Sequence, residues 1–295
     1  MNYKAKRIFL LGEEWFFFKI YLGPETSEVF LTEEFYNIVN HLLKNNIITE
    51  WFFIRYADPD YHLRIRLRLK KQEDIGVLIQ KILPSIKLYV DHGLIWNYQI
   101  DTYKRELERY GSNTIDFSED IFYFDSMFIL SFLKYYKEND SNENLRWLSG
   151  LSAIDSLLDS FKCDLDTKIF ISNFLKESYY KEFGVSKIFR QELSKKYRAN
   201  KKEIEFFLTK SYCNDKNYDF LSNLINTKEE NIKGPCLDII DSEAQGTLDV
   251  SINSLICSHI HMLCNRLFLV KNRANELVIY DFLFRYYQSL KARRK

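Results

Sequence analysis

The sequence HLRIRLRL at residues 62–69 alternates polar and apolar side chains. Successive side chains of a strand point to opposite faces, so one face of this segment would hold His62, Arg64, Arg66 and Arg68. Arginine carries a permanent charge on a planar fork that binds carboxylates or phosphates through paired hydrogen bonds. The pattern fits an anion-binding surface, and it also fits a half-exposed strand with a solvated face. Both interpretations stay open at this point.

A second charged segment, DTYKRELERYGS, occupies residues 101–112. In a helix, Glu106 and Arg109 lie three residues apart on one face and can form an ion pair. In an extended strand, Arg105 and Arg109 share one face and Glu106 points to the other. An isolated pair of this kind is more often a surface ion pair ahead of a turn than part of a site. The sequence does not decide between helix and strand.

The segment SHIHMLCNRL at residues 258–267 carries uncommon polar residues inside an apolar stretch with helical spacing. A lone histidine on such a helix is more often a core residue. His261 followed by Asn265 and Arg266 indicates a site instead, because a buried charge needs a partner or a function. An unperturbed imidazole has a pKa of about 6.5 and exchanges protons near neutrality.

The five cysteines indicate neither a disulfide framework nor a structural zinc site. Their number is odd and none forms a C-x-x-C pair, which fits a reducing cytoplasm. A zinc site on segment 257–264 is disfavoured because His259 and His261 would lie about 200° apart on a helix. We therefore expect no metal and no cofactor.

The chain has 295 residues, 42 Lys+Arg, 41 Asp+Glu and a formal net charge of +1. This balance argues against nucleic-acid binding as the main function, because phosphate neutralisation requires a basic surplus. The hydrophobic content of 46% is typical of globular proteins. No stretch offers the roughly 20 apolar residues of a membrane span, and the apolar stretch near the start is too short for a signal peptide. We expect a cytoplasmic protein.

The elements that must position these residues are read from hydrophobic spacing and turn residues. The first part of the chain predicts a helix at 26–46, a second at 73–91, and strands at 15–22, 51–56, 61–70 and 94–100. The proline-containing turn at 58–60 makes the second and third strands a hairpin. The later part predicts helices near 117–137, 144–161, 165–183, 187–210, 248–269 and 277–290.

These elements predict an α+β fold, with an antiparallel-rich sheet in the first ~105 residues packed against a mainly helical remainder. No repeat, long linker or low-complexity stretch divides the chain. We expect one domain over residues 1–295, with a sheet-rich part at about 1–112 and a helical part at about 113–295.

An ordered set of motifs resembles the thiopeptide-type bacteriocin biosynthesis domain, which is the C-terminal glutamate-elimination domain of class I lanthipeptide dehydratases. The set consists of HLRIRL (62–67) after a WFFIRY-x-D-P turn, ELERYG (106–111) preceded by Tyr103, F-x-F-D-S (122–126) and H-M-x-x-N-R (261–266). The opening WFFFKIY is similar to that domain's first strand. The resemblance covers the chain from about Glu14 to Leu290. Each motif alone is weak, and the ordered set is specific.

The resemblance implies a reaction and its catalytic residues. A separate domain of that family uses glutamyl-tRNA to esterify Ser or Thr side chains of a precursor peptide, and the elimination domain then removes glutamate to leave dehydroalanine or dehydrobutyrine. The matching catalytic positions are Arg64, Arg66, Glu106, Arg109 and His261. The arginines would bind the glutamyl group or stabilise its departing charge. The division of acid and base roles between His261 and Glu106 stays open.

The same resemblance implies substrate-binding positions, which are His62, Tyr103, Asn265 and Arg266. Two departures lie beside the site and change none of its charged members. Arg105 stands where the family often has proline, and Ser112 stands where a second glycine is common.

The resemblance also implies partners. It begins almost at Met1, so we expect a glutamylated precursor peptide as substrate and a separately encoded, tRNA-dependent glutamylation protein as the partner. We expect no direct nucleic-acid contact and no membrane span. The sequence leaves a homodimer open.

Two alternative functions are compatible with the same sequence features. A thiopeptide pyridine synthase joins two dehydroamino acids by a formal cycloaddition on the same scaffold, although those relatives tend to lack the elimination residues that are present here. A non-catalytic subunit could instead bind the peptide and present it to other enzymes, for which the aromatic content of 16% would be suitable.

Overall fold

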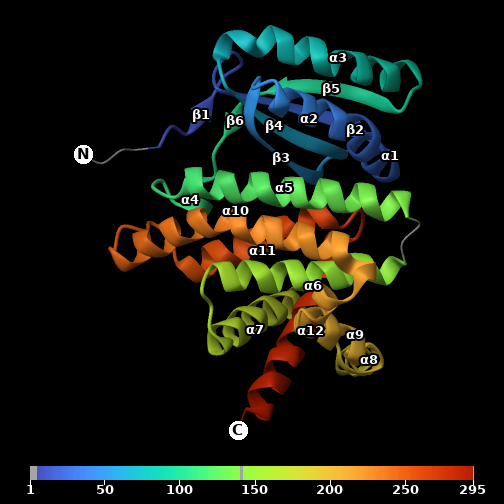
Figure 1. Cartoon of the computed structure of the whole chain (residues 1–295), viewed down its shortest axis with the longest axis vertical. Helices are drawn as coiled ribbons and strands as arrows, with labels where there is room; N and C mark the ends of the chain where they lie inside the picture. The colour runs from blue at the N-terminus through green and yellow to red at the C-terminus, as the bar shows by residue number, and fades with distance from the viewer. Residues whose placement is uncertain (1–4, 140–141, 295) are drawn as a thin grey trace.

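A four-stranded antiparallel sheet lies in the upper part of the molecule in Figure 1, beneath α3, and the lower part is helical. The computed structural model describes residues 5–139 and 142–294. The strand order is β3-β4-β2-β5, with β2 at Trp15–Leu22, β3 at Ile48–Ala57, β4 at Tyr61–Leu69 and β5 at Ile95–Asp101. A second, two-stranded sheet pairs β1 (Ile8–Phe9) with β6 (Tyr103–Lys104).

Helices connect and cover these strands. The first group is α1 (Pro24–Val29), a π-helical stretch at Phe30–Phe35, α2 (Tyr36–Lys44) and α3 (Ile75–Asp91). The second group, with α5 next to the sheet in Figure 1, is α4 (Leu107–Tyr110), α5 (Ile115–Glu138), α6 (Glu143–Ser160), α7 (Leu165–Glu182), α8 (Lys187–Ala199), α9 (Lys201–Leu208), α10 (Asp219–Ala244), α11 (Ile252–Leu267) and α12 (Asn272–Arg293). Short 3₁₀ turns lie at 72–74, 211–214 and 216–218.

The α+β prediction and the 51–70 hairpin are confirmed, and two details of the helical part were wrong. The predicted helix 187–210 is two helices, because Asn200 leaves helical geometry between α8 and α9. The sequence analysis also missed α10 at 219–244. Gly234 and Pro235 interrupt its pattern, yet packing against α5 and α6 keeps the helix continuous through them.

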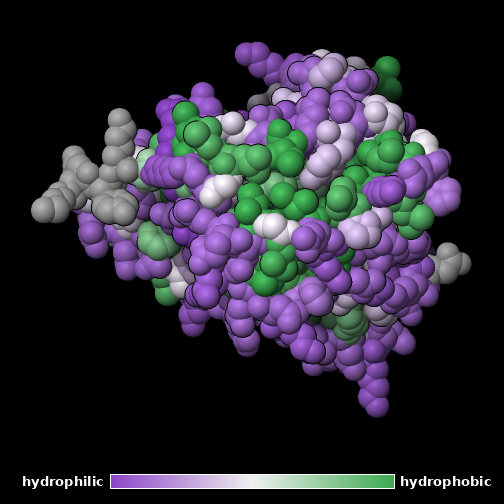
Figure 2. Space-filling view, turned by 90° about the horizontal axis from the view of Figure 1, so that it is seen from above, coloured by the Kyte–Doolittle hydropathy of each residue, from purple (hydrophilic) through white to green (hydrophobic). Residues whose placement is uncertain are grey.

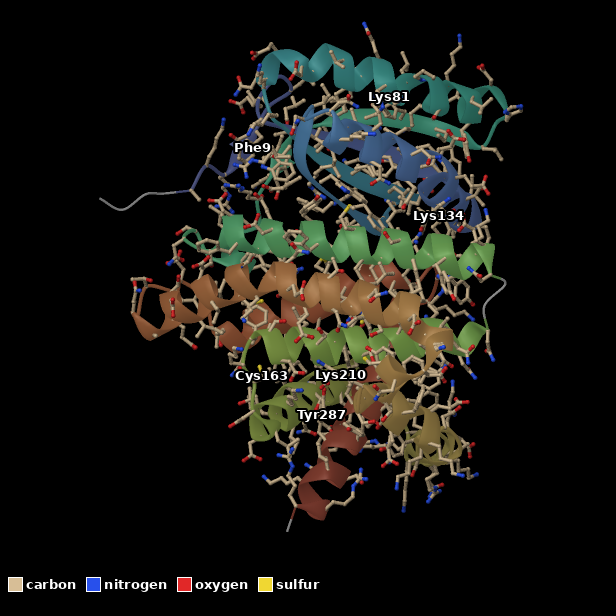
Figure 3. All side chains as sticks on the ribbon, in the orientation of Figure 1. Phe9, Lys81, Lys134, Cys163, Lys210 and Tyr287 are labelled. Atoms are coloured by element: carbon tan, nitrogen blue, oxygen red, sulfur yellow. The ribbon has the colours of Figure 1, made fainter. Side chains whose placement is uncertain are left out.

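The two faces of the sheet belong to different apolar clusters. Leu63, Ile65 and Leu67 of β4 are fully buried, and they pack in the large core that includes side chains of α2 and α3. The opposite face holds a smaller cluster around Phe17 and Phe52. Phe9, labelled in Figure 3, is fully buried in this smaller cluster. The predicted arginine face of β4 therefore lies on the side of the smaller cluster.

The outer edge of β3 is covered by side chains from α5 and α11. Ser126 Oγ accepts a hydrogen bond from the Phe53 amide at 3.3 Å, and Arg266 Nε donates to the Phe53 carbonyl at 2.9 Å. The Asn265 amide group pairs with both backbone groups of Arg55, at 2.9 and 2.8 Å. An uncovered edge strand leaves its peptide groups unpaired, so these contacts close the sheet and dock the two helices on it.

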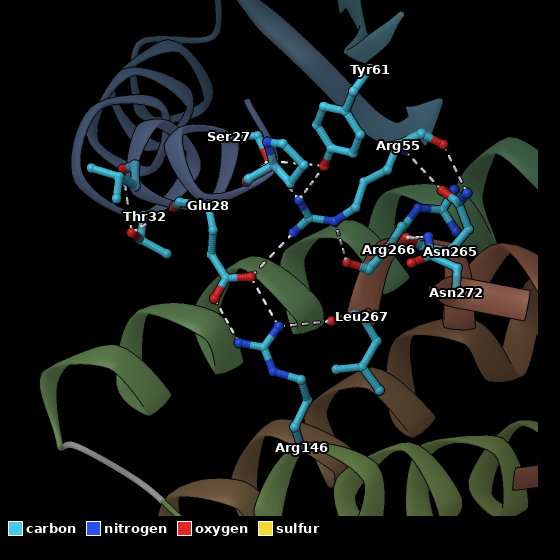
Figure 4. A network of polar contacts seen from close by, with 12 residues as sticks. Ser27, Glu28, Thr32, Arg55, Tyr61, Arg146, Asn265, Arg266, Leu267 and Asn272 are labelled. Carbon is cyan, nitrogen blue, oxygen red and sulfur yellow. Dashed lines mark hydrogen bonds and ion pairs between the residues drawn. The ribbon is translucent and has the colours of Figure 1, made fainter. Parts of the chain in front are cut away.

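Two arginines hold the C-terminal end of α11 (Figure 4). Arg55 Nε donates to the Arg266 carbonyl at 3.2 Å, and Arg146 Nη1 donates to the Leu267 carbonyl at 3.2 Å. Glu28 of α1 lies between both guanidinium groups, 2.6 Å from Arg146 and 3.5 Å from Arg55. Cations at the last carbonyls of a helix complement its dipole, so this cluster fixes where α11 ends against the sheet.

The outer side of α3 exposes apolar side chains. Val77, Leu83, Leu88 and Val90 of this helix are exposed. Figure 2, seen from above, shows hydrophobic residues gathered in the middle of the upper face of the molecule. Helix α3 covers the sheet face opposite the arginine face, so its exposed side chains take no part in positioning the site. Across residues 5–139 and 142–294, no helix combines the length and apolar character of a membrane span.

Replacing Asn265 by alanine is expected to destabilise the protein without changing its fold. The Asn265→Ala variant leaves the buried backbone groups of Arg55 without partners, which costs about 1–3 kcal/mol. Urea unfolding should show a lower midpoint with an unchanged m value. Asn231→Ala is the matched control, because within residues 5–139 and 142–294 the exposed Asn231 side chain bonds to Thr227 of its own helix, so its loss should matter little. Equal losses in the two variants would contradict the role of the edge contact.

Candidate functional site

Arg66 lies in a cage of aromatic rings and retains unused hydrogen-bond donors. Its guanidinium carbon is 4.4 Å from the Phe17 ring centre, 4.9 Å from Tyr103 and 5.1 Å from Phe52. The residue is 8% exposed, and neither Nε nor Nη1 has a hydrogen-bond partner in the described part of the chain. Burial lowers the pKa of Arg66, although an arginine stays charged at neutral pH. A buried cation with free donors is suited to bind an anion.

A cavity of about 40 Å³ opens beside Arg66. It is lined by Arg66, Tyr103, Glu106, Tyr110 and Arg266, together with Phe52, Ile54, Lys104, Ile115, Phe122 and Met262. This volume holds about two or three water molecules, and a carboxylate group is of similar size. We call this space the arginine cavity. Four of the predicted site residues therefore meet at one place: Arg66, Tyr103, Glu106 and Arg266.

Positive charge exceeds negative charge in the buried layer beside the arginine cavity. Asp125 of the F-x-F-D-S motif is the shared partner of two buried cations, at 2.8 Å from Lys228 Nζ and 3.7 Å from Arg266 Nη1. Burial lowers the pKa of Arg266 to about 10, and its two Nη atoms have no hydrogen-bond partner among the described residues. The cavity lining itself holds the cations Arg66, Lys104 and Arg266 and one carboxylate, Glu106, and this excess of positive charge favours a bound anion.

Arg64 is positioned by two neighbours on the same sheet face. Its guanidinium lies 3.6 Å from the centre of the Tyr56 ring, and its Nε donates to His62 Nε2 at 3.0 Å. His62 is 1% exposed, and its Nδ1 lies 2.8 Å from the Asp60 carbonyl. Burial lowers the pKa of His62, which keeps the imidazole neutral and able to accept from Arg64. In this structure His62 supports Arg64, and a substrate contact of its own stays a prediction.

The 106–110 segment is helical, which settles the alternative that the sequence left open. Glu106 precedes the single turn of α4, and its carboxylate lies 3.3 Å from Arg109 Nε. Both side chains are solvent-exposed, at 62% and 45%. Gly111 follows with φ +77°, and a Cβ there would lie 2.6 Å from Thr114 Oγ1, so this turn requires glycine. The turn presents Glu106 at the mouth of the arginine cavity.

Tyr103 contributes its ring to the cage, while its hydroxyl is engaged elsewhere. Tyr103 Oη donates to buried Glu119 at 2.6 Å, and Arg105 Nε donates to the same carboxylate oxygen at 2.8 Å. Burial and the charge of Glu119 raise the pKa of Tyr103. Burial alone would lower the pKa of Arg105, but Glu119 and Asp116 outweigh it and raise that pKa. Arg105, at the position where the resembled family often has proline, therefore holds the carboxylate to which Tyr103 of the cavity lining donates.

His261 lies at a second cavity, which borders a neighbouring face of α11. This space of about 640 Å³ is lined by His261 and Asn265, together with Arg55, Tyr56, Ala57, Tyr61, Phe183, Glu276 and residues 269–274. We call it the histidine cavity. The adjacent residues Met262 and Arg266 line the arginine cavity. On β3, Ile54 lines the arginine cavity and Tyr56 lines the histidine cavity. The predicted site is therefore divided between two neighbouring cavities that share α11 and β3.

The sequence analysis missed three residues that surround His261. His261 Nδ1 lies 2.8 Å from Glu276 Oε2, and the same oxygen accepts hydrogen bonds from Tyr179 at 2.5 Å and Tyr280 at 2.8 Å. These partners lie on α7 and α12. No motif or spacing connects them with His261, so the sequence held no signal for the contact.

His259 points away from His261, as the helical spacing predicted. Its ring packs 5.3 Å from Phe122, 5.4 Å from Tyr110 and 6.0 Å from Phe161, measured between ring centres. Both ring nitrogens lack hydrogen-bond partners among the described residues. Burial, followed by the charges of Arg266 and Lys228, lowers the pKa of His259 to about 3. His259 is a neutral core residue.

This buried histidine is expected to make the protein less stable in acid. The unfolded chain binds a proton on His259 below about pH 6.5 and the folded chain does not until about pH 3, so stability falls as the pH drops through that window. The contribution reaches about 2 kcal/mol at pH 5. His259→Phe, which suits the aromatic surroundings, should lose less stability between pH 7.5 and pH 5 in urea unfolding. An identical pH dependence in variant and wild type would disprove this.

The fold and the cavities define an α+β protein with a buried, electropositive site between a sheet and its flanking helices. The profile of the family described as lantibiotic biosynthesis dehydratase, C-terminal, matches residues 15–287, and the chain belongs to that family. This confirms the resemblance seen in the motifs. The chain is 26% identical over 274 residues to the subtilin biosynthesis protein SpaB of Bacillus subtilis, covering 90% of this chain and 24% of that protein.

Other similar proteins agree with this assignment. The nisin biosynthesis protein NisB of Lactococcus lactis subsp. lactis is 27% identical over 270 residues, covering 90% of this chain and 25% of that protein. The chain thus spans about a quarter of the length of these curated relatives. Its fold is similar to that of MibB, a tRNA-dependent lantibiotic dehydratase from Microbispora sp. 107891, with a TM-score of 0.75, 21% identity, and 97% of this chain and 29% of MibB covered.

The fold is also similar to that of TbtD, a pyridine synthase from thiomuracin biosynthesis. The TM-score is 0.64 at 10% identity, with 94% of this chain and all of TbtD covered. At identities this low, a structural match shows a shared fold, and the chemistry has to follow from the residues of the site.

Proposed function

We propose that this protein eliminates glutamate from glutamylated Ser or Thr side chains of a precursor peptide, leaving dehydroalanine or dehydrobutyrine. The observation that carries the proposal is Arg66, a buried guanidinium with free donors in a cavity of carboxylate size. The leaving group of this reaction is a carboxylate, and the excess positive charge around the cavity favours its departure. Membership of the dehydratase C-terminal family supports the same assignment.

The reaction needs no external oxidant or reductant. A base removes the proton from the α-carbon of the modified residue, and that electron pair forms the Cα–Cβ double bond. The Cβ–O bond breaks, and its electron pair leaves on the carboxylate of glutamate. Arg66 and Arg266 would receive this carboxylate, and Arg64 would stabilise charge on the peptide next to them. Glu106 and Arg109 would contact the substrate at the cavity mouth, while His261 would handle the proton.

The proposal includes two partners. The substrate is a glutamylated precursor peptide, and a separately encoded, tRNA-dependent glutamylation protein prepares it. The net charge of +1 supports a division in which that partner binds the tRNA. A cytoplasmic location belongs to the same proposal.

Loss of the Arg66 side-chain charge should abolish elimination selectively. The protein is mixed with a synthetic peptide that carries a glutamyl ester on serine, and mass spectrometry follows the loss of glutamic acid and the formation of dehydroalanine. Arg66→Gln should lower kcat by roughly 10²–10³-fold, the cost of removing one transition-state charge contact. Arg68→Gln is the matched control on the same strand face, where Arg68 is already paired with Glu50 at 3.3 Å. Equal rates in the two variants would refute the role of Arg66.

Pyridine formation is the second candidate, favoured by the fold likeness to TbtD over the whole of that chain. The same protein is incubated with a peptide that carries two dehydroalanines. Formation of a ring there, together with no elimination from the glutamyl ester, would replace the proposal. In a system reconstituted with the glutamylation partner, product formation and complex formation that both persist unchanged in His261→Ala would instead favour a subunit that only binds the peptide.

A further inference from the structure

The contacts of His261 define the state of its two ring nitrogens. Nδ1 lies 2.8 Å from Glu276 Oε2, and Glu276 is fully buried. Nε2 has no hydrogen-bond partner among residues 5–139 and 142–294. The His261 side chain is 29% exposed and lines the histidine cavity. One nitrogen therefore faces the protein interior, and the ring borders a space that a peptide could enter.

All the contacts of the Glu276 carboxyl group are made by Oε2, while its buried Oε1 has no hydrogen-bond partner among the described residues. Tyr179 and Tyr280 both donate to its Oε2, at 2.5 and 2.8 Å. Burial, with the charge of Glu276 contributing, raises the pKa of each tyrosine, so both keep their protons. An oxygen that already accepts from two hydroxyl groups has no hydrogen to give to a third partner. His261 Nδ1 must then carry the hydrogen of this contact, and a neutral His261 must have its lone pair on Nε2.

We propose that Glu276 is the positioning residue that makes His261 Nε2 the base of this site. The inference rests on the proposed elimination reaction, to which it adds the identity of the base and its supporting group. The Cα proton of the modified residue moves to Nε2, the electron pair forms the double bond, and glutamate leaves as its carboxylate. Glu276 stabilises the imidazolium formed in this step, and the proton then passes to solvent. Tyr179 and Tyr280 fix the carboxylate in place.

This arrangement distinguishes His261 from Glu106 as the base. Glu106 is 62% exposed, and its carboxylate is already paired with Arg109 at 3.3 Å. His261 has a buried carboxylate behind it and an open cavity beside it. The other charged groups of that cavity are Arg55, Lys271 and Arg273, and Cys264 is the further titratable group close to Glu276.

The first test measures the ring protons of His261 directly. The protein is labelled with ¹⁵N-histidine, and NMR identifies the protonated nitrogen of each of its five histidines, with His261→Asn assigning the resonances. Neutral wild-type His261 should carry its proton on Nδ1. A proton on Nε2 would overturn the proposal without any variant of Glu276. This readout does not depend on activity, so it stays decisive if the glutamyl peptide is not a substrate.

The second test separates positioning from folding. Glu276→Gln replaces the acceptor by a group that also donates, so the His261 tautomers should mix and kcat for glutamate release should fall by roughly 10²-fold or more at an unchanged KM. Glu182→Gln is the matched control on the same helix pair, because Glu182 pairs with Arg273 at the surface. If Glu276→Gln fails to fold, Glu276→Asp keeps the charge and should show a smaller loss. A full kcat with an Nδ1 proton in a folded Glu276 variant would overturn the proposal.

Discussion

The position of α11 depends on how its last residues are held against the edge of the sheet. Asn265 and Arg266 bond the backbone of β3 through their side chains, while Arg55 and Arg146 donate to the carbonyls at the helix end (Figure 4). Glu28 neutralises the two clamping arginines. His261 lies one turn before this junction, and Arg66 lies on the adjacent strand of the sheet. A shift of α11 would therefore alter both cavities together, because the helix and the strand β3 line each of them.

Carboxylates in the described interior are distributed unevenly, so some buried arginines are paired with them while Arg66 keeps free hydrogen-bond donors. Arg105 has both oxygens of Glu119 and also Asp116 within hydrogen-bond distance. Arg55 shares Glu28 with Arg146. Arg66 has aromatic rings in place of a carboxylate. Aromatic ring faces offset part of the free-energy cost of desolvating a cation and leave its hydrogen-bond donors available. A salt bridge would occupy those donors.

Sequence patterns predicted the sheet well because a strand with one buried face alternates strictly between apolar and polar side chains. The leucine and isoleucine positions of β4 are all buried, and the arginine positions face the smaller cluster as expected. Helix α10 was not predicted because it contains a Gly-Pro pair, which locally favours the end of a helix. Its packing against two long helices overrides that local preference. The break at Asn200 was missed for a related reason: the apolar spacing continues from α8 into α9 although the helix axis does not.

The sequence by itself determined the family, the α+β class and the residue types that the site could use, since motifs and alternation are properties of the chain order. Only the tertiary structure decided what each side chain does. Asn265 and Arg266, expected at the substrate, close the sheet edge, and Arg266 also lines the arginine cavity. Glu276, Tyr179 and Tyr280 gather around His261 from other helices. Such partners are determined by which helix faces pack against each other, and the spacing of residues along the chain does not predict that packing.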